Sequence, residues 1–235
     1  MENHPGLTAY FQRYEQKYLL TSVQYHAVLE LLKKYAYTDD YGLSTIYSLY
    51  YDTPSFAIAR KSTDKSTYKE KLRLRTYGIP QAGDIIHWEL KKKLQGITYK
   101  QRISLPFTPA SLEFKGDTHT LVCDEIRWFL AYYQPIPQCL ISYERLAFQS
   151  REQANLRITF DTQVRFRASD LDFSHGPSGA LLLDENRFLM EIKTDRSIPL
   201  FLSTYLTQLS LFPVSYSKYR MAFEQLIYKQ EPQYA

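Results

Sequence analysis

Three consecutive runs of the sequence decide the fold: residues 68–77 read YKEKLRLRTY, residues 84–93 read DIIHWELKKK, and residues 97–105 read ITYKQRISL. Each run is rich in aromatic or β-branched residues and places apolar and charged side chains in alternation, which is typical of strands with one buried face. The connections GIPQAG at 78–83 and LQG at 94–96 carry turn residues. This stretch therefore predicts a meander of antiparallel hairpins.

The same signals extend outward in both directions. Further strands are predicted over residues 11–20, 43–51, 138–149, 155–167 and 187–193. Helices are predicted over 23–35, 55–61, 120–133, 200–211 and 218–228, the first with an N-cap at Thr21-Ser22. Because the strands are grouped rather than alternating with helices, the pattern predicts an α+β protein dominated by an antiparallel sheet. No repeat or linker interrupts it, so one domain over residues 1–235 is expected.

Composition narrows the function classes. The chain has 235 residues, 44% of them hydrophobic, with a formal net charge of +4. Only 8 residues are Gly, which argues against a glycine-rich loop as the main phosphate-binding device, and the two Cys residues show neither metal-type spacing nor a disulfide framework. The N-terminus lacks an apolar signal region and no long apolar run occurs, so we expect a cytoplasmic protein without direct membrane insertion.

The charged residues of the predicted strands fall on one face. Because residues i and i+2 of a strand point to the same side, the following sets share a face: Arg13 with Glu15 and Lys17, Arg73 with Arg75, Glu89 with Lys91, Lys100 with Arg102, Tyr143 with Arg145, Arg157 with Thr159 and Asp161, and Glu191 with Lys193. Such a face can simply be solvated. However, cations dominate it, and the opposite face carries large apolar residues that helices could cover.

A closed barrel would turn this face inward. We therefore predict a closed antiparallel β-barrel of about eight strands that forms a tunnel, with helices packed outside. Roughly ten cations in a narrow tunnel would repel one another strongly, so the tunnel must hold water or a multiply charged anion. Arg and Lys suit a phosphate chain, and the few carboxylates suit Mg²⁺ or Mn²⁺.

Nine short segments, taken in order, resemble a known family. They are Arg13–Tyr18, Tyr50–Thr53, Leu72–Gly78, Trp88–Lys91, Tyr99–Arg102, Tyr143–Phe148, Leu156–Asp161, Leu189–Lys193 and Ser217–Tyr219. Their order and spacing resemble the triphosphate tunnel metalloenzymes, also called the CYTH superfamily, and within it the VTC-type polyphosphate polymerase domain. The resemblance covers most of the chain, from Arg13 to about Tyr219.

The resemblance implies roles for individual residues. Residues that would contact the phosphates of ATP or of the polymer are Lys17, Arg73, Arg75, Lys91, Arg145, Arg157, Lys193 and Lys218. Further substrate-binding candidates are Arg60, Lys100, Arg102, Tyr143 and Ser217, and Lys61 fits the place of Arg60 nearly as well. Glu191 resembles the metal-binding glutamate, with Glu89 and Glu15 as further candidates for Mn²⁺ or Mg²⁺.

Three functions stay open at this point. The first is a polymerase that transfers the γ-phosphate of ATP to polyphosphate or pyrophosphate. The second is a tunnel triphosphatase, which Arg13 disfavours because many superfamily hydrolases begin with Glu-x-Glu-x-Lys and Arg13 replaces the first Glu. The third is a non-catalytic polyanion-binding module. Nucleic acid is not expected, since no recognised motif occurs. Eukaryotic family members carry a phosphate-sensing domain and membrane helices, so regulatory or membrane functions would here come from separate partner proteins.

Overall fold

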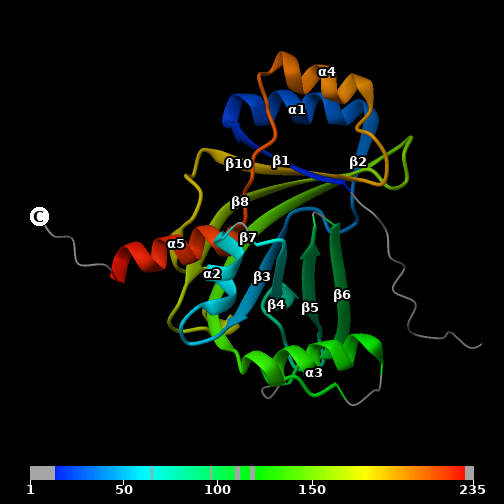
Figure 1. Cartoon of the computed structure of the whole chain (residues 1–235). Helices are drawn as coiled ribbons and strands as arrows, with labels where there is room; N and C mark the ends of the chain where they lie inside the picture. The colour runs from blue at the N-terminus through cyan, green and yellow to red at the C-terminus, as the bar shows by residue number, and fades with distance from the viewer. Residues whose placement is uncertain (1–13, 65, 96, 109–111, 117–119, 231–235) are drawn as a thin grey trace, which may run out of the picture. The chain divides into compact units, whose positions relative to one another are not determined.

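The computed structural model describes residues 14–64, 66–95, 97–108, 112–116 and 120–230, with side chains to residue 226 (Figure 1). Arg13 lies outside this part. The strands are β1 Tyr14–Thr21, β2 Ala36–Thr38, β3 Ser44–Asp52, β4 Tyr68–Tyr77, β5 Ile85–Leu94, β6 Ile97–Pro106, β7 Ile136–Ser150, β8 Arg157–Arg167, β9 Ala180–Leu181 and β10 Arg187–Thr194. The helices are α1 Ser22–Tyr35, α2 Ala57–Thr63, α3 Leu121–Tyr133, the 3₁₀ turn η2 Phe173–His175, α4 Leu200–Gln208 and α5 Lys218–Gln230.

The predicted elements are present with small shifts at their ends. β4 begins and ends where the sequence predicts, and α1 starts after Thr21, whose hydroxyl accepts from the Gln24 backbone while the Gln24 side chain accepts from the Thr21 backbone. The short strands β2 and β9 and the turn η2 were not predicted, since each is too brief to show a period. None of the helices in the described part of the chain has the length and apolar character needed to cross a membrane.

The strand order corrects one prediction. Hydrogen bonding arranges the strands as β1-β10-β8-β7-β3-β4-β5-β6, with β2 added to β7 and β9 to β8. Within the described residues this path ends at β1 and β6, which do not pair, so the sheet is open and the prediction of a closed barrel is wrong. The α+β class and the antiparallel pairing are confirmed. The alternation of side chains predicts only which face of a strand each residue occupies. Closure of a barrel depends instead on whether the two edge strands pair, which alternation does not reveal.

The chain divides into two compact units, which we describe separately. Within the described residues, unit 1 is built from Tyr47–Leu140 and Ala168–Gly176, and unit 2 from residues 14–46, Ile141–Arg167 and residues 177–230. Two of the boundaries between them fall inside strands β3 and β7. The prediction of a single domain stays a prediction.

Unit 1 packs its sheet of β3, β4, β5 and β6 against α2 and α3. Leu72 and Leu74 of β4 and Trp88 of β5 are almost fully buried in a core that α3 completes with Ile126 and Phe129. Since side chains alternate, this apolar face leaves the odd-numbered charged residues of β4 and β5 on the other side of the sheet. The packing thus positions the first group of candidate site residues.

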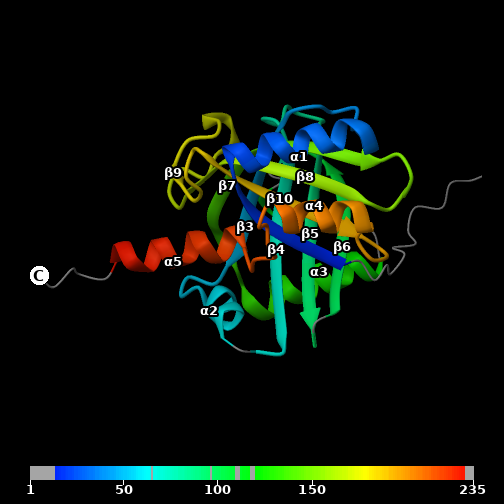
Figure 2. The ribbon, with the colours of Figure 1, turned by 90° about the horizontal axis from the view of Figure 1, so that it is seen from above.

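Unit 2 repeats this arrangement with β1, β10 and β8. Helices α1 and α4 lie side by side against its sheet (Figures 1 and 2), where Val28 and Leu32 of α1 and Leu206 of α4 meet Phe160 and Ile192 of the strands. The helices cover the even-numbered side chains of β1 and β10. Glu15, Lys17, Glu191 and Lys193 therefore point away from this core.

Candidate phosphate-binding site

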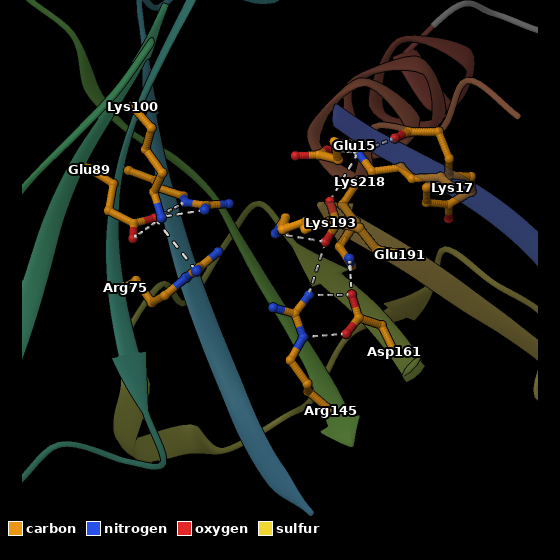
Figure 3. A network of polar contacts seen from close by, with 12 residues as sticks. Glu15, Lys17, Arg75, Glu89, Lys100, Arg145, Asp161, Glu191, Lys193 and Lys218 are labelled. Atoms are coloured by element: carbon orange, nitrogen blue, oxygen red, sulfur yellow. Dashed lines mark hydrogen bonds and ion pairs between the residues drawn. The ribbon is translucent and has the colours of Figure 1, made fainter. Parts of the chain in front are cut away.

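In unit 1, four cations surround one buried carboxylate (Figure 3). Glu89 lies at the centre of three neighbouring strands, directly opposite Arg73 on β4 and Arg102 on β6. Arg75 and Lys100 come from the diagonal positions two residues along the same strands. We call Arg73, Arg75, Glu89, Lys100 and Arg102 the Glu89 cluster. It exists because the β4-β5-β6 meander pairs in this register.

The contacts of Glu89 use both carboxylate oxygens. Its Oε2 accepts from Nε and Nη2 of Arg73 at 2.8 and 2.7 Å and has Nη1 of Arg75 at 3.7 Å. Its Oε1 accepts from Nζ of Lys100 at 2.8 Å and from Nε of Arg102 at 2.8 Å. The side chain of Glu89 is only 1% exposed, whereas those of Lys100 and Arg102 are about two-fifths and one-third exposed. When all four cations are charged, the cluster therefore has a surplus of three positive charges, which solvent or a ligand can reach.

The electrostatics follow from this crowding. Burial alone would raise the pKa of Glu89, but Arg73, Arg75 and the other cations hold the pKa well below its usual value. Burial, together with the neighbouring guanidinium groups, lowers the pKa of Lys100 to about 7, against the opposing influence of Glu89. The side chain of Lys100 thus gains or loses its proton at a pH near neutrality. A bound anion would favour the charged form.

Tyr50 supports the Glu89 cluster from the neighbouring strand β3. Its hydroxyl oxygen accepts from Nη1 of Arg73 at 3.0 Å, and the Arg73 guanidinium lies 5.8 Å from the centre of its ring. Tyr50 belongs to one of the nine segments that resemble the family, but no role was predicted for it. The only available signal was its place in that segment.

In unit 2, a second network joins cations and carboxylates in nearly equal number (Figure 3). The register of β1 and β10 places Lys17 opposite Glu191 and Glu15 opposite Lys193. Nζ of Lys193 lies 3.1 Å from Glu191 Oε2, and Nζ of Lys17 lies 3.0 Å from Glu15 and 3.8 Å from Glu191. Nη2 of Arg145 lies 3.8 Å from Glu191.

Asp161 anchors the other side of this network. Arg145 donates to it through Nε at 2.6 Å and Nη2 at 2.7 Å, and Lys218 donates at 2.5 Å. The Asp161 side chain is 0% exposed. The ring of Tyr143 packs against both cations, 5.1 Å from the Arg145 guanidinium and 4.3 Å from Lys218 Nζ. We call the set of Glu15, Lys17, Tyr143, Arg145, Asp161, Glu191, Lys193 and Lys218 the Glu191 cluster.

Asp161 lies on the predicted charged face of its strand, but no site role was predicted for it. Its position two residues after Thr159 was the available signal. Burial alone would raise the pKa of Asp161, but Arg145 and Lys218 lower it. Asp161 therefore stays ionised and fixes two of the predicted phosphate contacts.

The Glu191 cluster contains oxygen donors that could hold a divalent metal. Burial alone would raise the pKa of Glu191, but Lys193, a hydrogen bond with Glu15 and the cations Lys17 and Arg145 hold the pKa well below its usual value. Glu15 and Glu191 are thus close neighbours. Among the described residues, no three His, Cys, Asp or Glu side chains form a ready metal site. Two adjacent carboxylates still fit a Mg²⁺-like ion, which usually takes its remaining ligands from water and substrate phosphates.

Four predicted residues have other surroundings. Arg157 is exposed and donates to Asp39 at 2.8 Å. Arg60 is exposed on α2 and donates to the carbonyl of Ser55 at 3.0 Å. Lys91 lies on β5 opposite Lys71 and Lys100. Ser217 caps α5, since its hydroxyl accepts from the backbone of Arg220. Their roles in phosphate binding stay predictions.

Comparison with known proteins decides the family. The model of the VTC domain matches residues 12–227. The chain belongs to the VTC domain family. The resemblance noted from the nine segments is therefore confirmed at the level of the VTC domain.

Solved structures similar to this VTC domain share little of its sequence. The PH1819 protein of Pyrococcus horikoshii OT3 is 12% identical, with a TM-score of 0.45 over 90% of this chain and 99% of that chain. A chain of the Schizosaccharomyces pombe Mediator head module is 11% identical, with a TM-score of 0.45 over 85% and 91%. The Mimivirus capping enzyme triphosphatase is 10% identical, with a TM-score of 0.37 over 86% and 88%. No curated protein matches the chain.

One segment of the VTC match has a structural explanation. Asp52, at the end of β3, is fully buried and accepts from the backbone of Thr53 at 2.8 Å, of Ile58 at 2.9 Å and of Ala59 at 2.9 Å. Its carboxylate therefore caps the first turn of α2. In this VTC domain, Tyr50 thus contacts Arg73 of the Glu89 cluster, whereas Asp52 stabilises the start of α2.

Proposed function

We propose that this VTC domain is a polyphosphate polymerase that transfers the γ-phosphate of ATP to inorganic polyphosphate or pyrophosphate. The observation that carries the proposal is the Glu89 cluster, in which four cations share one buried carboxylate. Such a surplus of positive charge favours binding of a multiply charged anion. Arg73 and Arg102 supply guanidinium forks for phosphate oxygens, and Lys100 supplies a point charge.

We propose Glu89 as the counter-ion of these cations rather than as a metal ligand. Both of its oxygens already accept from guanidinium or ammonium groups. A divalent metal beside it would face four positive charges. Glu89 instead holds the side chains of the cluster in place before substrate arrives, which avoids reorganisation during the reaction.

Glu191, with Glu15, is the proposed holder of Mn²⁺ or Mg²⁺. A divalent ion bound there would neutralise charge on bridging phosphate oxygens. Within unit 2, Lys17, Arg145, Lys193 and Lys218 would bind phosphate oxygens and stabilise the charge that builds up as the phosphoryl group moves. Tyr143 and Asp161 would keep Arg145 and Lys218 oriented toward those oxygens.

The reaction needs no strong base. The attacking terminal phosphate is already anionic, so positioning and charge neutralisation are the main requirements. The P–O bond between the β- and γ-phosphates of ATP breaks, a P–O bond to the acceptor forms, and ADP leaves. Because ATP is the donor, we also propose that the reaction takes place in the cytoplasm.

The test is incubation of the purified chain with γ-labelled ATP, Mn²⁺ and pyrophosphate, followed by separation of the products on a gel. We expect labelled chains longer than triphosphate in equal yield for the wild type and for Arg187→Gln, an exposed Arg outside both clusters. Arg73→Gln should lose most of this activity. Release of labelled orthophosphate alone would indicate hydrolysis, and binding of tripolyphosphate without turnover would indicate a non-catalytic module; either result would refute the proposal.

A further inference from the structure

Unit 2 contains a cavity on the side of its sheet opposite the Glu191 cluster. Its volume is about 480 Å³. Its lining residues come from α4, from the strands β1 and β10 and from the segments 196–198 and 211–213, at the edge of the core that these elements share. The strands contribute their even-numbered side chains, among them Gln16, Tyr18 and Ile192. This volume is within the range of small-molecule sites, roughly 300–1,000 Å³.

The lining combines an apolar body with one positive end. Ile192, Leu206, Leu211 and Phe212 supply apolar surface. Hydroxyl groups come from residues such as Thr194, Ser203 and Thr207. The only charged lining residue among the described ones is Arg196, and no Asp or Glu of that part of the chain lines the cavity.

Arg196 is exposed and its guanidinium has no ion pair or side-chain hydrogen bond within the described residues. Its neighbour Asp195 instead accepts from Asn155 at 2.8 Å. An unpaired guanidinium in the lining of a mostly apolar cavity complements a ligand with one anionic group. We propose that this cavity binds a small amphipathic anion, an aromatic or aliphatic body bearing a single carboxylate, sulfonate or phosphate group.

The chain connects this cavity to Lys17. Leu211, Phe212 and Pro213 line the cavity, and the next residue, Val214, donates its backbone N–H to the carbonyl of Lys17 at 2.7 Å. Nζ of Lys17 in turn donates to the carbonyl of Tyr216 at 3.0 Å. A ligand that moves or stiffens residues 211–216 therefore acts directly on Lys17. We infer that occupancy of the cavity changes the affinity of the Glu191 cluster for phosphate, a part of the inference that rests on the proposed function.

The binding part is tested with 8-anilinonaphthalene-1-sulfonate, an aromatic monoanion whose fluorescence rises in apolar surroundings. We expect the full chain to bind the dye saturably. Arg196→Gln should lower the affinity about five- to tenfold, because it removes one exposed charge-assisted contact. Thr207→Trp, which fills the cavity from its exposed side, should abolish binding. Arg187→Gln, the charge-matched control, and Trp128→Ala, which removes an exposed aromatic residue of unit 1, should bind like the wild type.

Equal affinity of the wild type, Arg196→Gln and Thr207→Trp would overturn the assigned site, as would loss of binding in Trp128→Ala alone. The coupling is tested by repeating the titration with saturating tripolyphosphate. A shift of at least twofold in the dissociation constant is expected, because linkage between two sites is reciprocal. No shift would refute the coupling. Calorimetry with tripolyphosphate alone separates a failed coupling from a phosphate site that does not bind.

Discussion

Replacing Asp161 by Asn is the sharpest test of how the Glu191 cluster is held. Asn has nearly the shape of Asp but no charge. In the wild type, Asp161 is fully buried and accepts two hydrogen bonds from Arg145 and one from Lys218. The substitution leaves both cations in place, with side chains only 12% and 14% exposed. Glu191, 3.8 Å from Arg145, is too distant to take over the bidentate contact.

The expected cost follows from the burial of the pair. Removing one partner of a buried ion pair typically destabilises a protein by about 3–5 kcal/mol. The lower end applies here, because an Asn oxygen still accepts one hydrogen bond and both cations keep some solvent contact. For a chain of this length, about 3 kcal/mol corresponds to a fall in Tm of roughly 6–12 °C.

The assay is urea and thermal unfolding of the purified wild type and variant. Asp39→Asn is the matched control, since Asp39 holds the exposed Arg157 in the same unit, and an exposed pair is worth about 0–1 kcal/mol. Tripolyphosphate should restore part of the stability lost in Asp161→Asn, because it supplies negative charge to the two cations. If Asp161→Asn costs no more than Asp39→Asn, Asp161 does not anchor the cluster.

The pH dependence of this difference has a definite sign. The folded-state pKa of Asp161 is lowered, so its contribution is fully present above the unfolded pKa near 3.9 and is lost as the pH falls through the folded value. The stability gap between the wild type and Asp161→Asn should therefore be constant at neutral pH and shrink below about pH 4. A gap that closes already near pH 6 would show that another group is responsible.

Three further outcomes are expected. Wild-type affinity for tripolyphosphate should fall as the pH rises above 7, because burial lowers the pKa of Lys100 to about 7 and only the protonated side chain attracts an anion. Calorimetry should show that Lys100→Arg makes the affinity nearly independent of pH in this range. The same pH dependence in the variant would show that Lys100 is not the group responsible. Glu191→Gln should abolish metal-dependent turnover yet keep tripolyphosphate binding, and unchanged turnover would disprove its metal role. Asp52→Ala should cost about 1–2 kcal/mol in urea unfolding, as for lost helix caps, whereas Asp64→Ala at the exposed end of α2 should not; equal effects would contradict the capping role.

The sequence determined the local structure and the faces of the strands. Leu72 and Leu74 are buried while Arg73 and Arg75 lie on the opposite face, as alternation required. The capping residues Thr21 and Thr120 set the starts of α1 and α3. These features depend on neighbours in the chain, so local patterns were enough to predict them.

The tertiary structure decided which charges meet. Strand register, which no single strand encodes, placed Glu89 between Arg73 and Arg102 and so made it a counter-ion. Long-range packing likewise brought Asp161 into contact with Arg145 and Lys218. It also placed Arg157 beside Asp39. Strand order left the sheet open where a closed barrel was predicted. Alternation tells which side of a strand a charge occupies, but its partner depends on segments far away in the sequence.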